Sequence, residues 1–245
     1  MAPRFSAKYS LNETSSLKAS YARSYQYLHL LSNSSSGSPT DAWMPSSNNI
    51  KPEIADQVGI GYFKNLKSNA YEFSIETYYK VLDNAIDYRT GAEVTLNATV
   101  EGELLYGEGR AYGLELFLKK KKGKFTGWLS YTLARSESKF ADIDKGAWFP
   151  TKQDRTHDIS LVGILALGER VKLSSTFVYY TGNAVTFPTG KYVIDNQTIN
   201  LYSQRNGSRM PNYHRMDIGL TLDNKKYKEI KNPDTGEIEK NKKES

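Results

Sequence analysis

The residues best suited to chemistry stand close together at Asp154, His157 and Asp158. An imidazole between two carboxylates can serve general acid–base catalysis or bind a metal ion, provided that a nucleophile or further ligands come from elsewhere in the chain. The sequence has 3 histidines and no cysteine, and no second cluster supplies those partners. We therefore interpret His157 as a residue that begins a strand at the water-exposed end of a sheet and forms hydrogen bonds there.

The other candidate residues point to surface roles. His214 and His29 have no chemical partners nearby in the sequence. The run from Asp142 through Asp144 to Gly146 has part of a calcium-loop pattern, but it lacks the third acidic position and the distal glutamate. We expect no enzyme activity, no catalytic residue, no metal site and no cofactor, and the sequence singles out no individual ligand-binding residue.

Charge and hydropathy exclude two broad classes of protein. The 245 residues carry a net charge of +6, but the lysines gather at short connections such as 119–124 and, interleaved with acids, in 225–243. A nucleic-acid binder would gather them into one stripe with base-stacking groups, so we expect no nucleic-acid partner. The longest apolar run, 159–167, is far shorter than the about 20 residues of a membrane-spanning helix.

Apolar and polar residues alternate with a period of two along most of the chain. This alternation is typical of strands with one apolar and one polar face, and we find no convincing helix. It predicts nine strands, at about 5–11, 17–22, 57–62, 71–81, 112–118, 125–133, 159–167, 171–180 and 215–222.

The connections between these strands alternate strictly between short and long. The short links are 12–15, 64–69, 120–124 and 168–170, and the long ones are 32–53, 83–109, 136–156 and 181–213. All short turns then fall on one edge of the sheet, which is the layout of an outer-membrane β-barrel with periplasmic turns and extracellular loops. The sequence therefore predicts an all-β, antiparallel up-and-down meander that forms part of a transmembrane barrel.

The two faces of this sheet, as the wall of a barrel, would have different surroundings. Apolar side chains would face outer-membrane lipid, whereas Glu76, Glu115 and Asp217 would face a watery lumen on the concave side. Seven residues should lie together on the lipid-facing surface and be unusually exposed in the isolated chain: Leu114, Leu116, Leu129, Leu161, Leu173, Ile218 and Leu220.

Nine strands do not close a barrel of this kind. Single-chain bacterial barrels have an even number of strands, and the first and ninth strands would be left as unsatisfied edges. The N-terminus also has no apolar segment of the kind found in secretory signals. We therefore expect a fragment of a larger barrel, with residues 1–223 as the partial outer-membrane barrel and 224–245 as a charged periplasmic turn or tail.

Three stretches resemble TonB-dependent outer-membrane receptors, particularly those of the Bacteroidota. They are Glu108-Gly-Arg-Ala-Tyr-Gly-Leu-Glu-Leu-Phe-Leu-Lys-Lys120 leading into 127–136, Asp154-Arg-Thr-His-Asp-Ile-Ser160 with 180–190, and Arg209-Met-Pro-Asn-Tyr-His-Arg-Met-Asp-Ile-Gly219. The resemblance covers residues 6–224 and implies about nine strands from the C-terminal part of a 22-stranded barrel. It also implies uptake of a siderophore, vitamin or oligosaccharide.

The resemblance further implies how partners would act. The imported ligand would contact the long extracellular loops, which carry Trp43, Trp148, Tyr192 and Tyr202 as exposed aromatic residues. TonB would act only through a plug segment that this sequence lacks, so the fragment alone would not transport. Two alternatives stay open at this point: a soluble or cell-surface β-sandwich that binds a partner, and an outer-membrane barrel hydrolase, for which we see no Ser/His/acid constellation.

Overall fold

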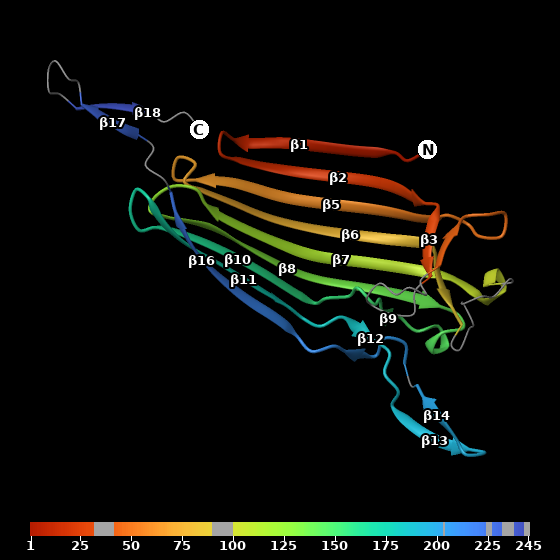
Figure 1. Cartoon of the computed structure of the whole chain (residues 1–245). Helices are drawn as coiled ribbons and strands as arrows, with labels where there is room; N and C mark the ends of the chain where they lie inside the picture. The colour runs from red at the N-terminus through yellow and green to blue at the C-terminus, as the bar shows by residue number, and fades with distance from the viewer. Residues whose placement is uncertain (32–41, 90–99, 203, 224–226, 232–237, 243–245) are drawn as a thin grey trace.

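A single antiparallel sheet dominates the computed structural model, which describes residues 1–31, 42–89, 100–202, 204–223, 227–231 and 238–242. Its strands follow one another in the order β1-β2-β5-β6-β7-β8-β10-β11-β16, and the short β9 adds to β8 (Figure 1). The wall strands are β1 (Arg4–Asn12), β2 (Ser15–Gln26), β5 (Glu53–Leu66), β6 (Tyr71–Tyr88), β7 (Leu104–Lys120), β8 (Phe125–Phe140), β10 (His157–Ala166), β11 (Val171–Tyr180) and β16 (Tyr213–Leu222); β9 is Phe149–Pro150.

The strand register sorts the side chains onto two faces. One row across six strands consists of apolar residues: Phe73, Leu118, Leu129, Leu161, Phe177 and Met216. A row displaced by an odd number of residues is mainly polar: Gly61, Glu76, Glu115, Thr132 and Asp158. Because alternate side chains of a strand point to opposite sides, these rows define an apolar face and a polar face.

The predicted lipid-facing residues all lie on the apolar face, and Glu76, Glu115 and Asp217 lie on the polar one. Leu129, Leu161, Leu173, Ile218 and Leu220 are between 36% and 69% exposed, while Leu114 and Leu116 are half-buried. The nine wall strands form one sheet in which each pairs with its neighbours along the chain, so the sandwich alternative is wrong. The meander prediction is confirmed.

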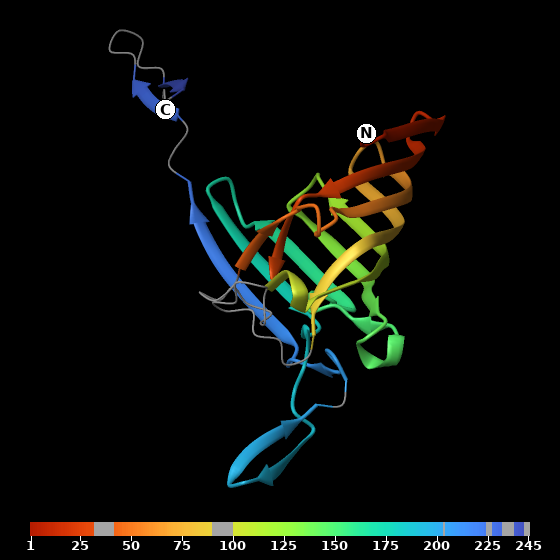
Figure 2. The same cartoon turned by 90° about the vertical axis from the view of Figure 1, so that its right-hand side faces the viewer.

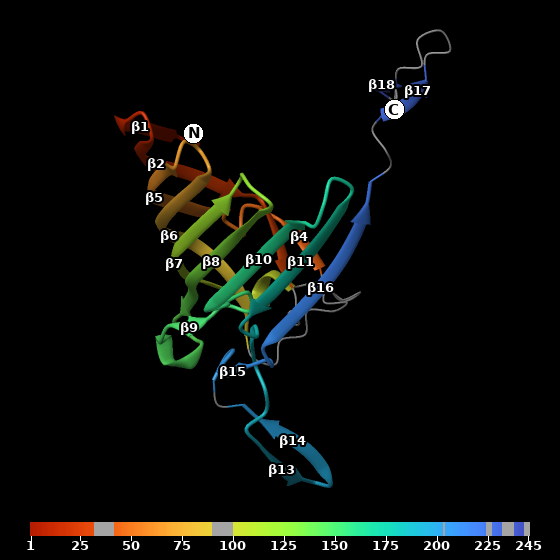
Figure 3. The ribbon, with the colours of Figure 1, turned by 90° about the vertical axis from the view of Figure 1, so that its left-hand side faces the viewer.

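The sheet is curved, and its connections divide by length between its two ends (Figures 2 and 3). The tight turns that join β1 to β2, β5 to β6, β7 to β8 and β10 to β11 share one edge, and the N-terminus lies at the other (Figure 1). Beyond the end of β16, β17 (Tyr227–Lys231) and β18 (Ile238–Lys242) pair as a hairpin. The alternation in the sequence predicts no strand in 224–245, so this hairpin is an addition to the predicted turn or tail.

The long links carry short elements of their own. These are β3 (Leu28–Leu31), β4 (Ala42–Pro45), η1 (Val100–Glu103), η2 (Asp144–Gly146), β12 (Ala184–Val185), β13 (Gly190–Ile194), β14 (Gln197–Leu201) and β15 (Ser208–Arg209). Within the described ranges the only helices are the two 3₁₀ turns η1 and η2. In that part of the chain we find no helix with the length and hydropathy needed to cross a membrane.

Candidate ligand-binding rim

The long-loop edge forms a structured rim, by which we mean the described residues of 27–53, 83–109, 136–156 and 181–213. Strands β6, β7 and β8 have 18, 17 and 16 residues, more than the about 9–11 that a tilted strand needs to cross a bilayer. A β-bulge at Asn84 marks where β6 leaves the wall, with φ of 57° and a shift of register between Asp83 and Ala85. The side-chain amide of Asn84 donates to the carbonyl of Pro52 at 3.1 Å, which holds the bulge against the rim.

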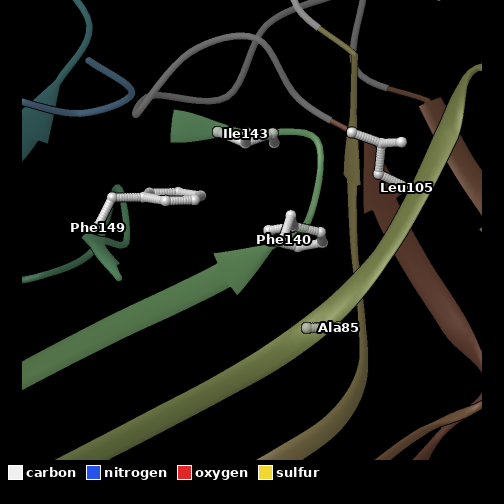
Figure 4. Packing of buried hydrophobic residues seen from close by; sticks show 5 residues of the cluster. All are labelled: Ala85, Leu105, Phe140, Ile143 and Phe149. Carbon is white, nitrogen blue, oxygen red and sulfur yellow. The ribbon is translucent and has the colours of Figure 1, made fainter. Parts of the chain in front are cut away.

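Above the bulge, a small apolar core covers one side of the extended strands. Ala85 of β6, Leu105 of β7 and Phe140 of β8 are buried together with Ile143 and Phe149 from the following link (Figure 4). The Phe140 and Phe149 rings stack with centroids 6.0 Å apart. Burial of these side chains fixes the 136–156 link onto the sheet.

A second apolar cluster covers the other side. Ile50, only 1% exposed, packs with Leu104 and is flanked by Met44 and Ile86. The Tyr106 hydroxyl adds a hydrogen bond of 2.8 Å to the carbonyl of Asn49. The link between β2 and β5 is therefore tied to the same extended strands as the link after β8.

Asp154 is the most buried charged residue of the described chain, at 1% exposure. The backbone N–H of Ser136 donates to its Oδ1 at 2.6 Å, and Arg209 forms an ion pair with Oδ2 and donates to the Asp154 carbonyl at 2.7 Å. Nη1 of Arg135 lies 3.9 Å from the same Oδ2. A carboxylate without solvent needs such partners, so Asp154 joins the 136–156 and 181–213 links to β8.

Arg205 performs the same role for three links. Its guanidinium donates at 2.8 Å to both Asp87 Oδ1 and the carbonyl of Tyr88, and it lies 4.7 Å from the centroid of the Tyr88 ring. Its backbone N–H donates to the carboxylate of Asp144 at 3.0 Å. With a side chain only 10% exposed, Arg205 anchors the last long link to the two before it.

The next residue, Asn206, also ties the last long link to the link before it. It is 4% exposed; its side-chain amide donates to the carbonyl of Pro150 at 2.9 Å, and its backbone N–H donates to Thr186 Oγ1 at 2.9 Å. Buried polar groups with complete partners specify one arrangement of the surrounding backbone.

Glu137 lies where the rim meets the apolar face. Arg110 donates to its carboxylate from Nε at 2.8 Å, and Arg135 does so from Nε at 3.1 Å. Burial acts most strongly on this group and raises the pKa of the Glu137 carboxyl, but the hydrogen bonds from Arg110 and Arg135 together outweigh it and lower the pKa below its usual 4.5. The carboxylate therefore stays ionised between its two arginines.

The structure gives the candidate histidines surface or packing roles. His157 begins β10; its Nδ1 lies 2.9 Å from the Tyr131 hydroxyl, and its backbone N–H donates to Thr181 Oγ1. His29 is 4% exposed, with Ser46 Oγ 3.1 Å from Nε2, and burial lowers the pKa of its imidazole. His214 is exposed in β16.

The acidic candidates have no metal-binding arrangement around them. Asp144, from the partial calcium-loop pattern, accepts the Arg205 backbone N–H instead of facing open solvent. Among the residues that the structure describes, no group of three or more His, Asp or Glu side chains could hold a metal ion.

Of the four aromatic residues predicted to be exposed on the loops, three are. Trp43, Tyr192 and Tyr202 are 61%, 45% and 47% exposed. The prediction for Trp148 is wrong: this residue is half-buried because the Arg110 guanidinium stacks 4.2 Å from its ring centroid and Lys139 lies beside it.

The chain resembles known receptors in both sequence and fold. The family described as "TonB dependent receptor-like, beta-barrel" matches residues 1–231. The ferripyoverdine receptor of the outer membrane of Pseudomonas aeruginosa shares the fold with a TM-score of 0.58 and 14% identity over 89% of this chain and 26% of its own. The FrpB iron transporter of Neisseria meningitidis also shares the fold, with a TM-score of 0.58. It is 13% identical in sequence over 90% of this chain and 32% of its own.

The chain thus spans between a quarter and a third of the length of these two solved receptors. A comparison with curated protein sequences found no significant match. The family match nevertheless extends over nearly all of the chain, and the family consists of receptors and transporters rather than enzymes. The chain therefore belongs to the TonB-dependent receptor β-barrel family, and its place is the outer membrane.

Proposed function

We propose that this chain forms part of the wall of a TonB-dependent receptor and that its rim contributes to binding a small imported ligand. The wall would let the ligand pass on the polar face, with lipid on the apolar face. Transport of this kind works through non-covalent binding and gated passage, so the proposal assigns no bond-breaking chemistry to the chain.

The observation that carries this proposal is the ordered rim. Ion pairs at Asp154 and Arg205 join the links 83–109, 136–156 and 181–213, and the cluster around Ile50 ties the link 27–53 to the same strands. Trp43, Tyr192 and Tyr202 stay exposed on these links. Binding residues are commonly found on loops that a rigid scaffold positions, and large aromatic rings supply contact area at a low cost in conformational entropy.

The polar face offers a suitable path for a hydrated solute. A hollow of about 550 Å³ lies on this face between β1 and β7, and Lys8, Lys18, Glu76 and Glu115 line it with small residues such as Gly61. Water can solvate charges of both signs there, whereas hydrocarbon could not.

The proposed ligand classes are a siderophore, a vitamin or an oligosaccharide. The two solved proteins of similar fold are named as a ferripyoverdine receptor and an iron transporter, so a ferric siderophore belongs in the first test. At 14% and 13% identity their likeness concerns the fold alone, and the other two classes need equal weight.

Tryptophan fluorescence tests the proposal directly. The chain, reconstituted in detergent, is titrated with a ferric hydroxamate siderophore, cobalamin and a set of oligosaccharides. We expect saturable quenching by one class. A Trp43→Phe variant should lose much of that signal, because Trp43 is the exposed tryptophan of the rim.

Trp128→Phe is the matched control. This tryptophan lies in β8 near the short turns and packs on Phe117, far along the strand from the rim. Its removal should leave the ligand affinity unchanged. Quenching that never saturates with any class, or that depends on Trp128 instead of Trp43, would contradict binding at the rim.

A further inference from the structure

A groove runs along the apolar face just below the rim. Its volume is about 810 Å³, and its apolar lining includes Val58, Ile60, Leu114 and Leu133. The small side chain of Thr77, in register between Ile60 and Leu114, leaves the space that these larger neighbours border. The surface that meets lipid tails is therefore not smooth here.

The charged lining of this groove consists of two arginines and no acid. Arg110 and Arg135 lie at its long-loop end, together with Thr156, while Tyr79 and Tyr112 stack 6.1 Å apart along its side. The hollow thus has an apolar length and a cationic end.

The arginines retain hydrogen-bonding capacity. Glu137 is shared between them and uses Nε and Nη2 of Arg110 and Nε of Arg135. Within the described residues, Nη1 of Arg110 and Nη2 of Arg135 make no hydrogen bond. Arg135 also lies 3.9 Å from the carboxylate of Asp154, which pairs more closely with Arg209. Three arginines thus share the two carboxylates of Glu137 and Asp154, which leaves one positive charge in excess at the groove end.

Along the strands, these arginines lie at the level expected for the headgroups of the membrane lipids. Arg110 lies ten positions from Lys120, the last residue of β7, and Arg135 ten positions from Phe125, the first residue of β8. Ten residues at about 3.3 Å each, tilted by about 40°, rise about 25 Å, which is the height of the apolar band of such barrels. The rim begins at the next position of each strand, at Gly109 in β7 and Ser136 in β8.

From these observations we propose that the groove binds one anionic lipid of the outer leaflet, with an acyl chain along Val58, Ile60 and Leu114 and its phosphate at Arg110 and Arg135. Guanidinium groups pair with phosphate oxygens through charge-assisted hydrogen bonds. This site rests on the outer-membrane location of the chain and is independent of ligand import, so failure of the rim to bind a ligand would not affect it.

Native mass spectrometry of the reconstituted chain tests the proposal. The chain is placed in nanodiscs of equal parts phosphatidylglycerol and phosphatidylcholine with identical acyl chains, and the lipids retained after release are counted. We expect about a tenfold enrichment of phosphatidylglycerol in the first retained lipid, falling to the bulk ratio in the Arg110→Gln/Arg135→Gln double variant.

Two further variants separate binding from folding. Thr77→Trp fills the groove while leaving both arginines and Glu137 in place, and it should reduce retention of the first lipid several-fold. Arg215→Gln removes an arginine that is ion-paired with Asp217 on the polar face, and it should leave the enrichment unchanged. Equal retention of both lipids by the unaltered chain, or an enrichment that survives both the double variant and Thr77→Trp, would overturn the site.

Discussion

The wall and the rim of this chain are stabilised in different ways. In the wall, every residue of β1 and β16 is exposed, and apolar side chains such as Ile218 and Leu220 are 69% exposed. In the rim, Ile50, Phe140, Ile143 and Phe149 are at most 4% exposed. The buried Asp154 pairs there with Arg209, and Arg205 forms a largely buried pair with Asp87. All the large buried apolar side chains of the described chain belong to the rim.

The difference follows from what surrounds each region. Lipid covers the apolar face of a barrel wall, so the protein needs no second layer, and the backbone is satisfied by strand pairing alone. Loops that extend beyond the bilayer are surrounded by water and must bury their own apolar groups to stay ordered. The rim therefore behaves as a small globular core attached to a membrane wall, and the two regions should respond differently to the same kind of mutation.

The largest effect should follow from Asp154→Ala. Removing this carboxylate leaves Arg209 and the Ser136 N–H without their partner, and breaking a buried ion pair costs about 3–5 kcal/mol. We expect residues 136–156 and 181–213 to become susceptible to limited proteolysis while the wall strands keep their protection from hydrogen exchange.

The matched control is Asp217→Ala, which breaks the exposed Arg215–Asp217 pair of the wall. Surface pairs contribute little, so no change in proteolysis is expected. Equal sensitivity of the two variants would mean that the rim is no more dependent on its ion pairs than the wall.

The apolar core gives the next largest effect. Phe140→Ala should destabilise the rim by about 3 kcal/mol, because it removes a ring that is 2% exposed and stacked on Phe149. Leu220→Ala, at a wall position that is 69% exposed, should barely alter denaturation in detergent. Urea titration, monitored by hydrogen exchange, measures the stability of both variants. A larger loss of stability in Leu220→Ala than in Phe140→Ala would reverse the comparison between wall and rim.

Within the wall, the contrast lies between the two faces. Leu129 and Ser130 are neighbours in β8 that point to opposite faces near the middle of the span. Lysine on the lipid side should cost about 2–4 kcal/mol at this depth, so Leu129→Lys should reduce the folded fraction in bilayers. Ser130→Lys should be tolerated because water reaches the polar face. Similar folded fractions for the two variants, measured by heat-modifiable gel migration, would contradict the assignment of the faces.

The sequence predicts the wall well because its signals are local. Alternation in segments such as 112–118 and 125–133 defines both the strands and their faces, and the link lengths place every short turn at one edge. The register follows, since a slip by one residue would move every apolar side chain to the wrong face.

The rim could not be predicted in this way. Arg205 and Asp87 are 118 positions apart, and no periodicity marks either residue as a buried partner. The sequence places Asp154 beside His157 as a candidate for chemistry, yet in the structure its carboxylate joins two links to β8. The burial of Trp148 depends on Arg110 from another strand. Such contacts arise only after the wall has brought distant links together, and they carry no local pattern.

The smallest expected effect concerns pH and the β3–β4 hairpin of the rim. Burial lowers the pKa of His29 below its ordinary 6.5, so the folded state favours the neutral imidazole. Its contribution to stability is complete above pH 6.5 and is lost as the pH falls from there towards the lower pKa of the folded state. Amide exchange in β3 and β4, corrected for intrinsic rates, should therefore accelerate as the pH falls from 7.5 to 5.

Two variants test whether His29 causes this acceleration. His29→Gln keeps a polar group near Ser46 but does not titrate, so it should remove the acceleration. His214→Gln, at an exposed wall position, should leave the acceleration unchanged. An unchanged pH response in His29→Gln would contradict this prediction and assign the sensitivity to other titrating groups.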